Sequence, residues 1–286
     1  MEIIRITSKD LKKLSKYKLH DSIENTESIL YLYKKRELLK IFKSTDEDYR
    51  INKNYILNRL FYLQEHINMP ELIMPKELVK VSGKNTGFTM EFIKENTNLS
   101  LIFKNSKISI EDKLFFLKEI GKIIEKIESN EVLKTNLFQL GDIHEGNFIF
   151  DNKNNMVKAV DLDSSYVDGM NAPNSKFLTF NDKLWDFPNK YPLDSNDRHI
   201  PNYNTTIISY IYMILNMITE EYVPNMTISD FCSNLNILND VGLNKELLDS
   251  IFAIYLPKEN YLDFELVETI NPKLILKYRE IKNAKK

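Results

Sequence analysis

Short apolar runs bounded by charged residues dominate the first ninety or so positions, and their lengths are typical of β-strands. Residues 28–33 (SILYLY) and 37–42 (ELLKIF) flank three consecutive basic residues, a pattern that favours a β-hairpin. Two further strands are expected over residues 77–81 and 87–93. Apolar residues recur at helical spacing over residues 54–67 and predict a single helix there.

Helical periodicity takes over after residue 93. Ser109-Ile-Glu-Asp112 resembles a capping box, and positions 114, 117, 120, 124 and 127 place apolar side chains on one face of the helix that it opens. Residues 207–218 are apolar nearly all round, which is typical of a helix buried in a helical body.

Two other segments complete the outline. Residues 147–150 and 157–160 are short apolar runs around a polar turn and predict a second hairpin. Residues 171–203 are rich in Pro, Asn and Asp and predict a long ordered loop. The pattern as a whole predicts an α+β protein with a small sheet-bearing part followed by a larger, mainly helical part.

The composition narrows the class of protein without naming an activity. Among 286 residues, 43% are hydrophobic and the formal net charge is −2, so no global field favours nucleic acid or an anionic membrane surface. Cys232 is the only cysteine, which excludes an intrachain disulfide. The apolar run 207–218 is too short to span a bilayer, and the charged start MEIIRITSKDLKKL does not resemble a signal peptide. We therefore expect a cytoplasmic protein without a membrane span.

The richest set of candidate functional residues lies between Leu140 and Asp163 (LGDIHEGNFIF, a turn, then VKAVDLD). Asp142, Asn147 and Asp161 fall at the ends of the predicted strands or in the loop between them. Phosphoryl transfer needs an oxygen base near the incoming hydroxyl and hard oxygen ligands for Mg²⁺. An Asp followed five positions later by Asn, and then by an Asp after a hairpin, provides such a set.

This segment resembles the catalytic loop and metal-binding segment of the protein-kinase-like superfamily, especially its aminoglycoside and choline kinase-like members. The resemblance implies that Asp142 is the catalytic base and that Asn147 and Asp161 bind Mg²⁺. Asp163 is a second metal contact or a loop cap, and both roles stay open. His144 stands where the small-molecule kinases often have His.

The resemblance extends upstream and covers roughly residues 20–220. Lys40 matches the strand lysine that pairs with the α- and β-phosphates of ATP. Met90 matches the residue behind the adenine pocket, and the backbone of Glu91, Phe92 and Ile93 matches the segment that binds the base.

The resemblance implies a two-lobed fold. The small lobe, residues 1–93, is a β-sheet with one helix that covers the nucleotide. The large lobe, residues 94–286, is mainly helical and carries the catalytic and metal-binding segments. ATP and Mg²⁺ are expected in the cleft between them.

Three departures from the family pattern are visible in the sequence. The phosphate-covering loop falls within residues 21–28 (DSIENTES) and contains no glycine, although glycine lets backbone N–H groups approach phosphate. The helix that offers a Glu to the strand lysine has Asn58 and Arg59 at the expected positions, and Glu65 lies further along. Thr206 stands where the central helix often begins with Asp.

The interpretation favoured by these residues is an ATP-dependent phosphotransferase that moves the γ-phosphoryl group to a hydroxyl on a small molecule or protein. A pseudokinase, which is a kinase-shaped binding or scaffold protein with little catalysis, is the first alternative. The Asp-Leu-Asp at 161–163 also resembles the nucleophile motif of haloacid-dehalogenase-like phosphatases, but the region after it lacks alternating strands and helices. Metallophosphoesterases need several His ligands, and none of the four histidines here lies in their usual pairings.

Overall fold

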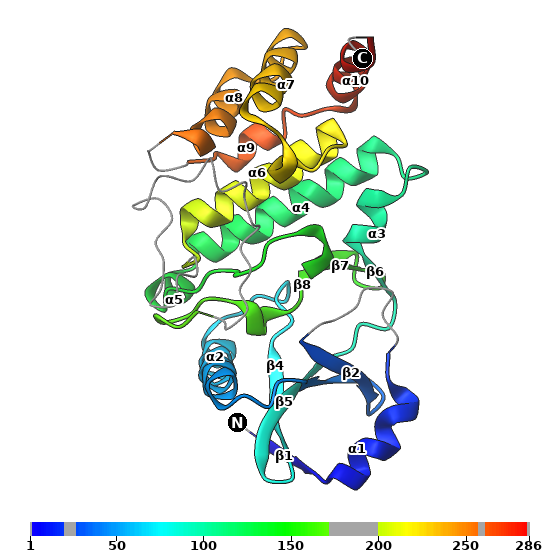
Figure 1. Ribbon diagram of the computed structural model, residues 1–286, viewed down its shortest axis with the longest axis vertical. Helices are drawn as coiled ribbons and strands as arrows, with labels where there is room; N and C mark the ends of the chain where they lie inside the picture. Colours follow the sequence, from blue (N-terminus) through cyan, green and yellow to red (C-terminus); the bar gives the residue numbers. More distant parts are fainter. Residues whose placement is uncertain (1, 20–26, 172–199, 257–260, 285–286) are drawn as a thin grey trace.

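The computed structural model describes residues 2–19, 27–171, 200–256 and 261–284, and it has an α+β fold (Figure 1). A mixed five-stranded sheet, in the order β1-β4-β5-β3-β2, lies at one end of the molecule. β1 runs parallel to β4 and the other neighbours are antiparallel. The strands are β1 (Glu2–Ile6), β2 (Ser28–Tyr33), β3 (Glu37–Phe42), β4 (Pro75–Val81) and β5 (Lys84–Glu91).

The predicted hairpin is confirmed with the expected bounds, because β2 and β3 pair antiparallel in register. β3 is flanked by β2 on one side and β5 on the other, where Lys40 lies opposite Phe88. At the next pair along, Gly87 lies so close to β3 that a Cβ there would come within 2.0 Å of the Lys40 carbonyl oxygen. Only glycine permits that approach.

Helix α2 (Glu47–His66) packs beside the sheet and begins earlier than the periodicity over residues 54–67 predicted. Asp46 caps it by accepting the Tyr49 N–H at 2.8 Å. Ile56, Leu60 and Leu63 on its buried face have no exposed surface and join the main core. The first two turns were missed because they are mostly polar and carry no apolar period.

The prediction of a single helix in the first part of the chain is wrong. Helix α1 (Ser8–Leu14) also lies there, followed by the short 3₁₀ turn η1 (Ser15–Tyr17). Thr7 and Asp10 form a capping box that starts it. None of its residues is fully buried, and only Leu11 and Leu14 pack against the sheet, which is too short an apolar stripe for a periodicity search to detect.

A second, three-stranded sheet, in the order β6-β7-β8, lies between the large sheet and the long helices. It consists of β6 (Asn96–Asn98), β7 (Phe148–Asp151) and β8 (Met156–Ala159). β7 and β8 pair antiparallel and form the hairpin that the sequence predicted over residues 147–150 and 157–160. β6 was not predicted.

The remaining described chain is mostly helical. The elements are α3 (Leu99–Lys104), α4 (Ile110–Ser129), α5 (Glu131–Thr135), α6 (Tyr203–Thr219), η5 (Val223–Asn225), α7 (Ile228–Asp240), α8 (Lys245–Phe252), η6 (Ala253–Tyr255), α9 (Phe264–Val267) and α10 (Pro272–Ala284). Ser109 caps α4 as expected, by accepting the Asp112 N–H. α6 is buried along nearly its whole length beside α4, and the Tyr210 hydroxyl donates to the Leu117 carbonyl at 2.9 Å.

Two of the segments predicted from the sequence lie partly outside the described residues. The long loop predicted over 171–203 is described only at its two ends, and the glycine-free loop of 21–28 only from residue 27 onward. Among the helices that the structure describes, none is both long and apolar enough to cross a membrane.

Shortening a leucine in α6 should be far more destabilising than shortening one on the surface. Leu215 is 1% exposed within the main core, whereas Leu276 of α10 is 50% exposed. We expect Leu215→Ala to lower the free energy of unfolding by about 2–5 kcal/mol, because it leaves a cavity. Leu276→Ala is the matched control and should change it by about 0.5 kcal/mol or less. Urea unfolding measures both, and equal losses would contradict the packing described for α6.

Candidate functional site

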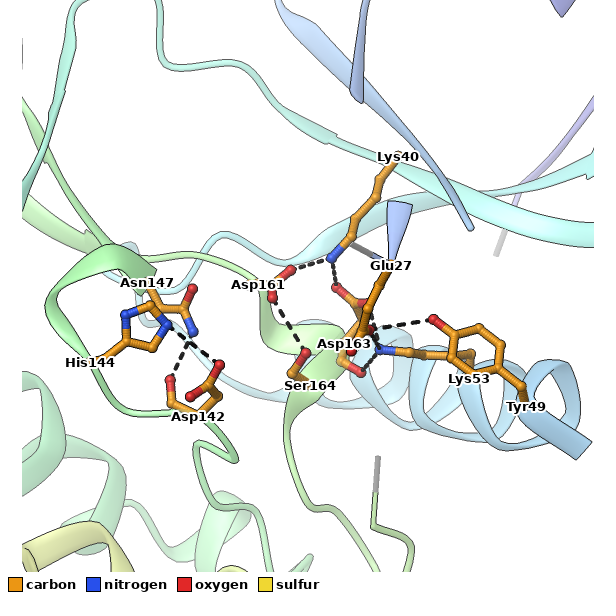
Figure 2. A network of polar contacts seen from close by, with 10 residues as sticks. All are labelled: Glu27, Lys40, Tyr49, Lys53, Asp142, His144, Asn147, Asp161, Asp163 and Ser164. Carbon is orange, nitrogen blue, oxygen red and sulfur yellow. Dashed lines mark hydrogen bonds and ion pairs between the residues drawn. The ribbon is translucent and has the colours of Figure 1, made fainter. Parts of the chain in front are cut away.

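Four charged side chains from three separate elements meet at one point of the structure (Figure 2). Lys40 comes from β3 and Lys53 from α2. Asp161 and Asp163 come from the segment after β8, where residues Leu162–Ser164 form the 3₁₀ turn η3. Lys40, Lys53 and Asp163 are each no more than 3% exposed.

Lys40 is the centre of this cluster. Its ammonium contacts the Asp161 carboxylate and lies 2.6 Å from Asp163 Oδ1. Burial of Lys40 opposes its charged form, but the charges of Asp161 and Asp163 outweigh burial and raise the pKa of the ammonium above its ordinary value. The amine therefore stays protonated, as a group that binds phosphate must be.

Asp163 is the most enclosed of the four. Its second carboxylate oxygen, Oδ2, accepts from Lys53 Nζ at 2.9 Å, and its backbone carbonyl accepts from the same ammonium at 2.9 Å. Burial disfavours the carboxylate, but Lys40 and Lys53 outweigh it and hold the pKa of Asp163 well below its usual range. Each oxygen of Asp163 is thus bound to a lysine, which argues against the metal role that the sequence left open for it.

Lys53 is the residue of this cluster that sequence reasoning missed. Asn58, which stands where the family helix carries its Glu, and Glu65, the next Glu along the helix, are both exposed. Lys53 instead points inward and is 1% exposed. Its ammonium also lies 3.4 Å from Glu27 Oε2 and within 6 Å of the Phe42 and Tyr49 rings. One signal was present in the sequence: Lys53 lies three residues before Ile56, on the apolar face of the same helix.

Asp161 has a backbone conformation that fits its position. Its φ of 63° lies in the left-handed region, which Asp tolerates better than most residues. The turn it begins brings the Ser164 hydroxyl within 3.3 Å of its Oδ2. The Asp161 side chain is 33% exposed, in contrast to the enclosed Asp163. One carboxylate of the pair therefore faces open space and the other does not.

The second half of the site is the loop that contains Asp142 (Figure 2). The Asn147 amide donates to the Asp142 carbonyl oxygen at 2.8 Å and closes the loop. His144 accepts the Gly146 N–H on Nδ1 at 3.0 Å, so its Nε2–H faces Asp142 Oδ2 at 3.4 Å. Burial lowers the pKa of His144, but hydrogen bonding and charge from Asp142 outweigh it and raise that pKa. His144 thus orients the Asp142 carboxylate.

Close backbone packing joins this loop to the Asp161 segment. A Cβ on Gly141 would lie 1.9 Å from the Ser164 carbonyl oxygen, so only glycine fits between the two strands of chain. Gln139 and Tyr166 exchange backbone hydrogen bonds at 2.9 and 3.0 Å. Thr206, at the start of α6, donates to the Gln139 side chain at 2.8 Å. Thr206 therefore supports the loop through Gln139, although it lacks the carboxylate expected at that position.

The residues predicted to bind adenine lie at the end of β5. Met90 and Ile93 are buried in an apolar cluster, while Glu91 is exposed. The Phe92 N–H donates to the Arg36 carbonyl at 3.0 Å, so it is not free to donate to a ligand. The Ile93 N–H makes no hydrogen bond within the part of the chain that the structure describes. Of the four, Ile93 is thus the best placed to offer its backbone to a ligand.

The apolar cluster around Met90 draws side chains from both the large sheet and the β7–β8 hairpin. Leu30 and Leu38 on the sheet, and Ile149 and Val160 on the hairpin side, are only partly buried against it. Half-buried apolar side chains therefore border this cluster from both the large sheet and the hairpin side.

The oxygen ligands that Mg²⁺ prefers are available at one place. Asn147 uses its amide nitrogen for Asp142, so its Oδ1, which has no other partner among the described residues, can bind a cation. Asp161 offers a partly exposed carboxylate. Within the described ranges, no group of three His, Cys, Asp or Glu side chains could hold a metal alone. Two ligands are nevertheless sufficient when phosphates supply the others.

Comparison of the chain with models of known protein families and with curated proteins finds no match. The chemistry of the site is therefore inferred from the contacts of its own residues.

Removing the Asp163 charge should destabilise the fold strongly, because Lys40 and Lys53 would lose their shared buried partner. We expect Asp163→Asn to lower the free energy of unfolding by about 3–5 kcal/mol at pH 7. Asp168→Asn is the matched control: Asp168 pairs with Arg59 at 3.2 Å but is 43% exposed, and we expect about 1 kcal/mol or less.

The loss of unfolding free energy in Asp163→Asn should become smaller as the pH falls. The pKa of Asp163 is depressed in the folded state, so its contribution is complete above the ordinary Asp value of about 3.9 and disappears as pH falls toward the folded value. Urea unfolding of wild type and Asp163→Asn at several pH values between 7 and 3 should show curves that differ by a constant amount and converge only below about pH 4. Convergence near neutrality would contradict the buried ion pairs.

Proposed function

We propose that this protein is an ATP-dependent phosphotransferase of protein-kinase-like architecture, with residues 1–93 and 94–286 as its two lobes. The observation that carries the proposal is that Lys40 of β3 lies beside Asp161, 121 residues further along the chain, and beside the loop that carries Asp142 and Asn147. Each residue has a proposed role: Lys40 is the cation that binds phosphates, and Asn147 and Asp161 are the oxygen ligands of a metal. Asp142 is the carboxylate that faces the acceptor hydroxyl.

The nucleotide side of the site is supported by apolar contacts and charge. The half-buried side chains of Leu30, Leu38, Ile149 and Val160 would contact the adenine ring, and the Ile93 N–H would bond its edge. Lys40 then faces the α- and β-phosphates. When bound, Mg²⁺ neutralises phosphate charge, and Asn147 and Asp161 are the residues that hold it.

The acceptor side is supported by a cavity of about 410 Å³ next to the Asp142 loop. Phe103, Lys113, Glu145, Met213, Tyr222 and Arg279 are among its lining residues. Glu145, three residues after Asp142 in the same loop, is one of these lining residues. A hydroxyl compound or a peptide side chain in the cavity would therefore lie beside the loop that carries the base.

The proposed reaction transfers the γ-phosphoryl group of ATP to a hydroxyl of the acceptor. The acceptor oxygen forms a bond to the γ-phosphorus as the bond from that phosphorus to the β–γ bridging oxygen breaks, and ADP leaves. Asp142 orients the acceptor hydroxyl and takes its proton, while His144 holds the Asp142 carboxylate in place. Lys40 stays protonated and stabilises the charge on the phosphates.

One observation favours the second candidate, a pseudokinase. Lys40 is bound by two carboxylates at once, and Glu27 lies beside Lys53 at the end of a glycine-free loop. These negative charges oppose phosphate. A binding or scaffold protein would tolerate them, whereas an enzyme must displace at least Asp161 from Lys40 when ATP and Mg²⁺ arrive.

Nucleotide binding separates the two candidates. We expect ATP with Mg²⁺ to raise the melting temperature, by an amount equivalent to about 2.7 kcal/mol when the ligand is at one hundred times its dissociation constant. Asp161→Asn should lose the part of the shift that requires Mg²⁺. Asp240→Asn, which changes an exposed Asp on α7, should keep it. A melting temperature indifferent to ATP, with and without Mg²⁺, would favour the scaffold.

Loss of the base should affect turnover more than binding. We expect Asp142→Asn to lower the rate of phosphate transfer from labelled ATP by about 10²–10⁴, because no carboxylate would remain in position to take the proton of the substrate hydroxyl. Its ATP affinity in the same preparation should match wild type. Autophosphorylation and a panel of hydroxyl-bearing metabolites supply the acceptors, and Asp240→Asn is again the control. Full turnover in Asp142→Asn would overturn the assignment of the base.

A further inference from the structure

We infer that Lys53 and Asp163 together perform the task that a helix glutamate performs in other kinase-like sites, with Lys53 as a positioning residue that acts on Lys40 through Asp163. The inference rests on the proposed function, since it explains how the phosphate-binding lysine is held. In kinases the strand lysine must pair with a Glu on the neighbouring helix for the site to be active. Here the helix presents a cation instead.

The contacts support each link of this arrangement. Lys40 Nζ lies 2.6 Å from Asp163 Oδ1, which is the contact that a helix carboxylate would otherwise make. The other oxygen of the same carboxylate lies 2.9 Å from Lys53 Nζ. The carboxylate thus comes from the segment after β8, and α2 contributes the group that fixes it.

Lys53 fixes more than the carboxylate. Its ammonium also binds the Asp163 backbone carbonyl at 2.9 Å, so it anchors the chain of η3 as well as the side chain. Two residues earlier, Asp161 offers its carboxylate toward the proposed metal position. A single helix cation therefore sets the position of both the Lys40 partner and the metal-binding segment.

The charge count agrees with this role. Lys40 and Lys53 carry two positive charges and Asp161 and Asp163 carry two negative charges, while Glu27 adds a third negative charge at the edge of the group, 3.4 Å from Lys53. A glutamate in place of Lys53 would leave three carboxylates around one lysine and would repel phosphate. The lysine on α2 is the charge that makes a carboxylate at position 163 compatible with a phosphate site.

Amine acylation of the full-length protein tests the inference without nucleotide. The rate at which acetic anhydride modifies Lys40 at pH 8, read by mass spectrometry, reports how firmly its carboxylate partners hold the ammonium in its buried position. Lys76, which is exposed, is the internal reference. We expect faster modification of Lys40 in both Asp163→Asn and Lys53→Met than in wild type.

The sign of the Lys53→Met effect is decisive. If Lys53 were only a nearby charge, its removal would strengthen protonation of Lys40 and slow acylation. If Lys53 positions Asp163, its removal loosens the carboxylate and speeds acylation. Lys53→Arg keeps the cation and should return the rate toward that of wild type. Unchanged or slower acylation in Lys53→Met would overturn the positioning role.

Nucleotide affinity provides the second readout. We expect Lys53→Met to weaken binding of ATP with Mg²⁺ by about 10–100-fold, the usual effect of removing a group that orients a ligand-binding residue. Wild type that fails to bind ATP with Mg²⁺ would overturn the proposed function. Wild-type ATP affinity in Lys53→Met would overturn the inference alone.

A double variant keeps the test usable if Lys53→Met does not fold. Lys53→Met/Asp163→Asn removes both charges of the buried pair, a change that the fold tolerates better than the loss of one. Because Lys53 acts through Asp163, the double variant should show no faster Lys40 acylation and no weaker ATP affinity than Asp163→Asn. A further loss in the double variant would contradict that route.

Discussion

The carboxylate of Asp163, buried between two lysine ammonium groups, is the constraint on which the candidate site depends. A carboxylate enclosed to this degree stays ionised only if nearby cations replace the solvation that it loses. Lys40 from β3 and Lys53 from α2 do so, at 2.6 and 2.9 Å. β3 and α2, which follow one another in the chain, must therefore meet the segment that carries Asp163, 110 residues after Lys53, at one point. Moving any of them leaves a buried charge without its partner, at a cost comparable to much of a domain's stability.

The geometry of the remaining site follows from that point. With Asp163 fixed, the short turn before it fixes Asp161, whose left-handed backbone directs a carboxylate toward open space. The close approach of Gly141 to the Ser164 carbonyl then sets the distance between this segment and the Asp142 loop. Within the loop, Asn147 and His144 hold Asp142 from two directions. The residues proposed for chemistry are thus held by short-range contacts that extend outward from the buried ion pairs.

Sequence reasoning found the parts of this structure that local patterns encode. Apolar runs of strand length predicted the β2–β3 hairpin, and an unbroken apolar surface predicted the buried helix α6. It did not predict α1, whose only core contacts are those of the partly buried Leu11 and Leu14. It also looked for a carboxylate on α2, because a local pattern cannot show that Asp163, 110 residues from Lys53, contacts both Lys40 and Lys53. A lysine on an apolar helix face indicates a buried partner, but the identity of the partner depends on the tertiary fold.

The cost of buried charge also bears on what the site is for. Replacing a buried ion pair by well-packed apolar residues of similar volume is often neutral or even stabilising, so charge is a poor means of attaching a helix to a sheet. A protein that used this region only as a scaffold would hold α2 equally well with leucines. Four alternating charges, one of them on a partly exposed carboxylate, are useful where a cation must be held ready for an anionic ligand. That difference favours the phosphotransferase over the scaffold, even though the loop at residues 21–28 lacks glycine.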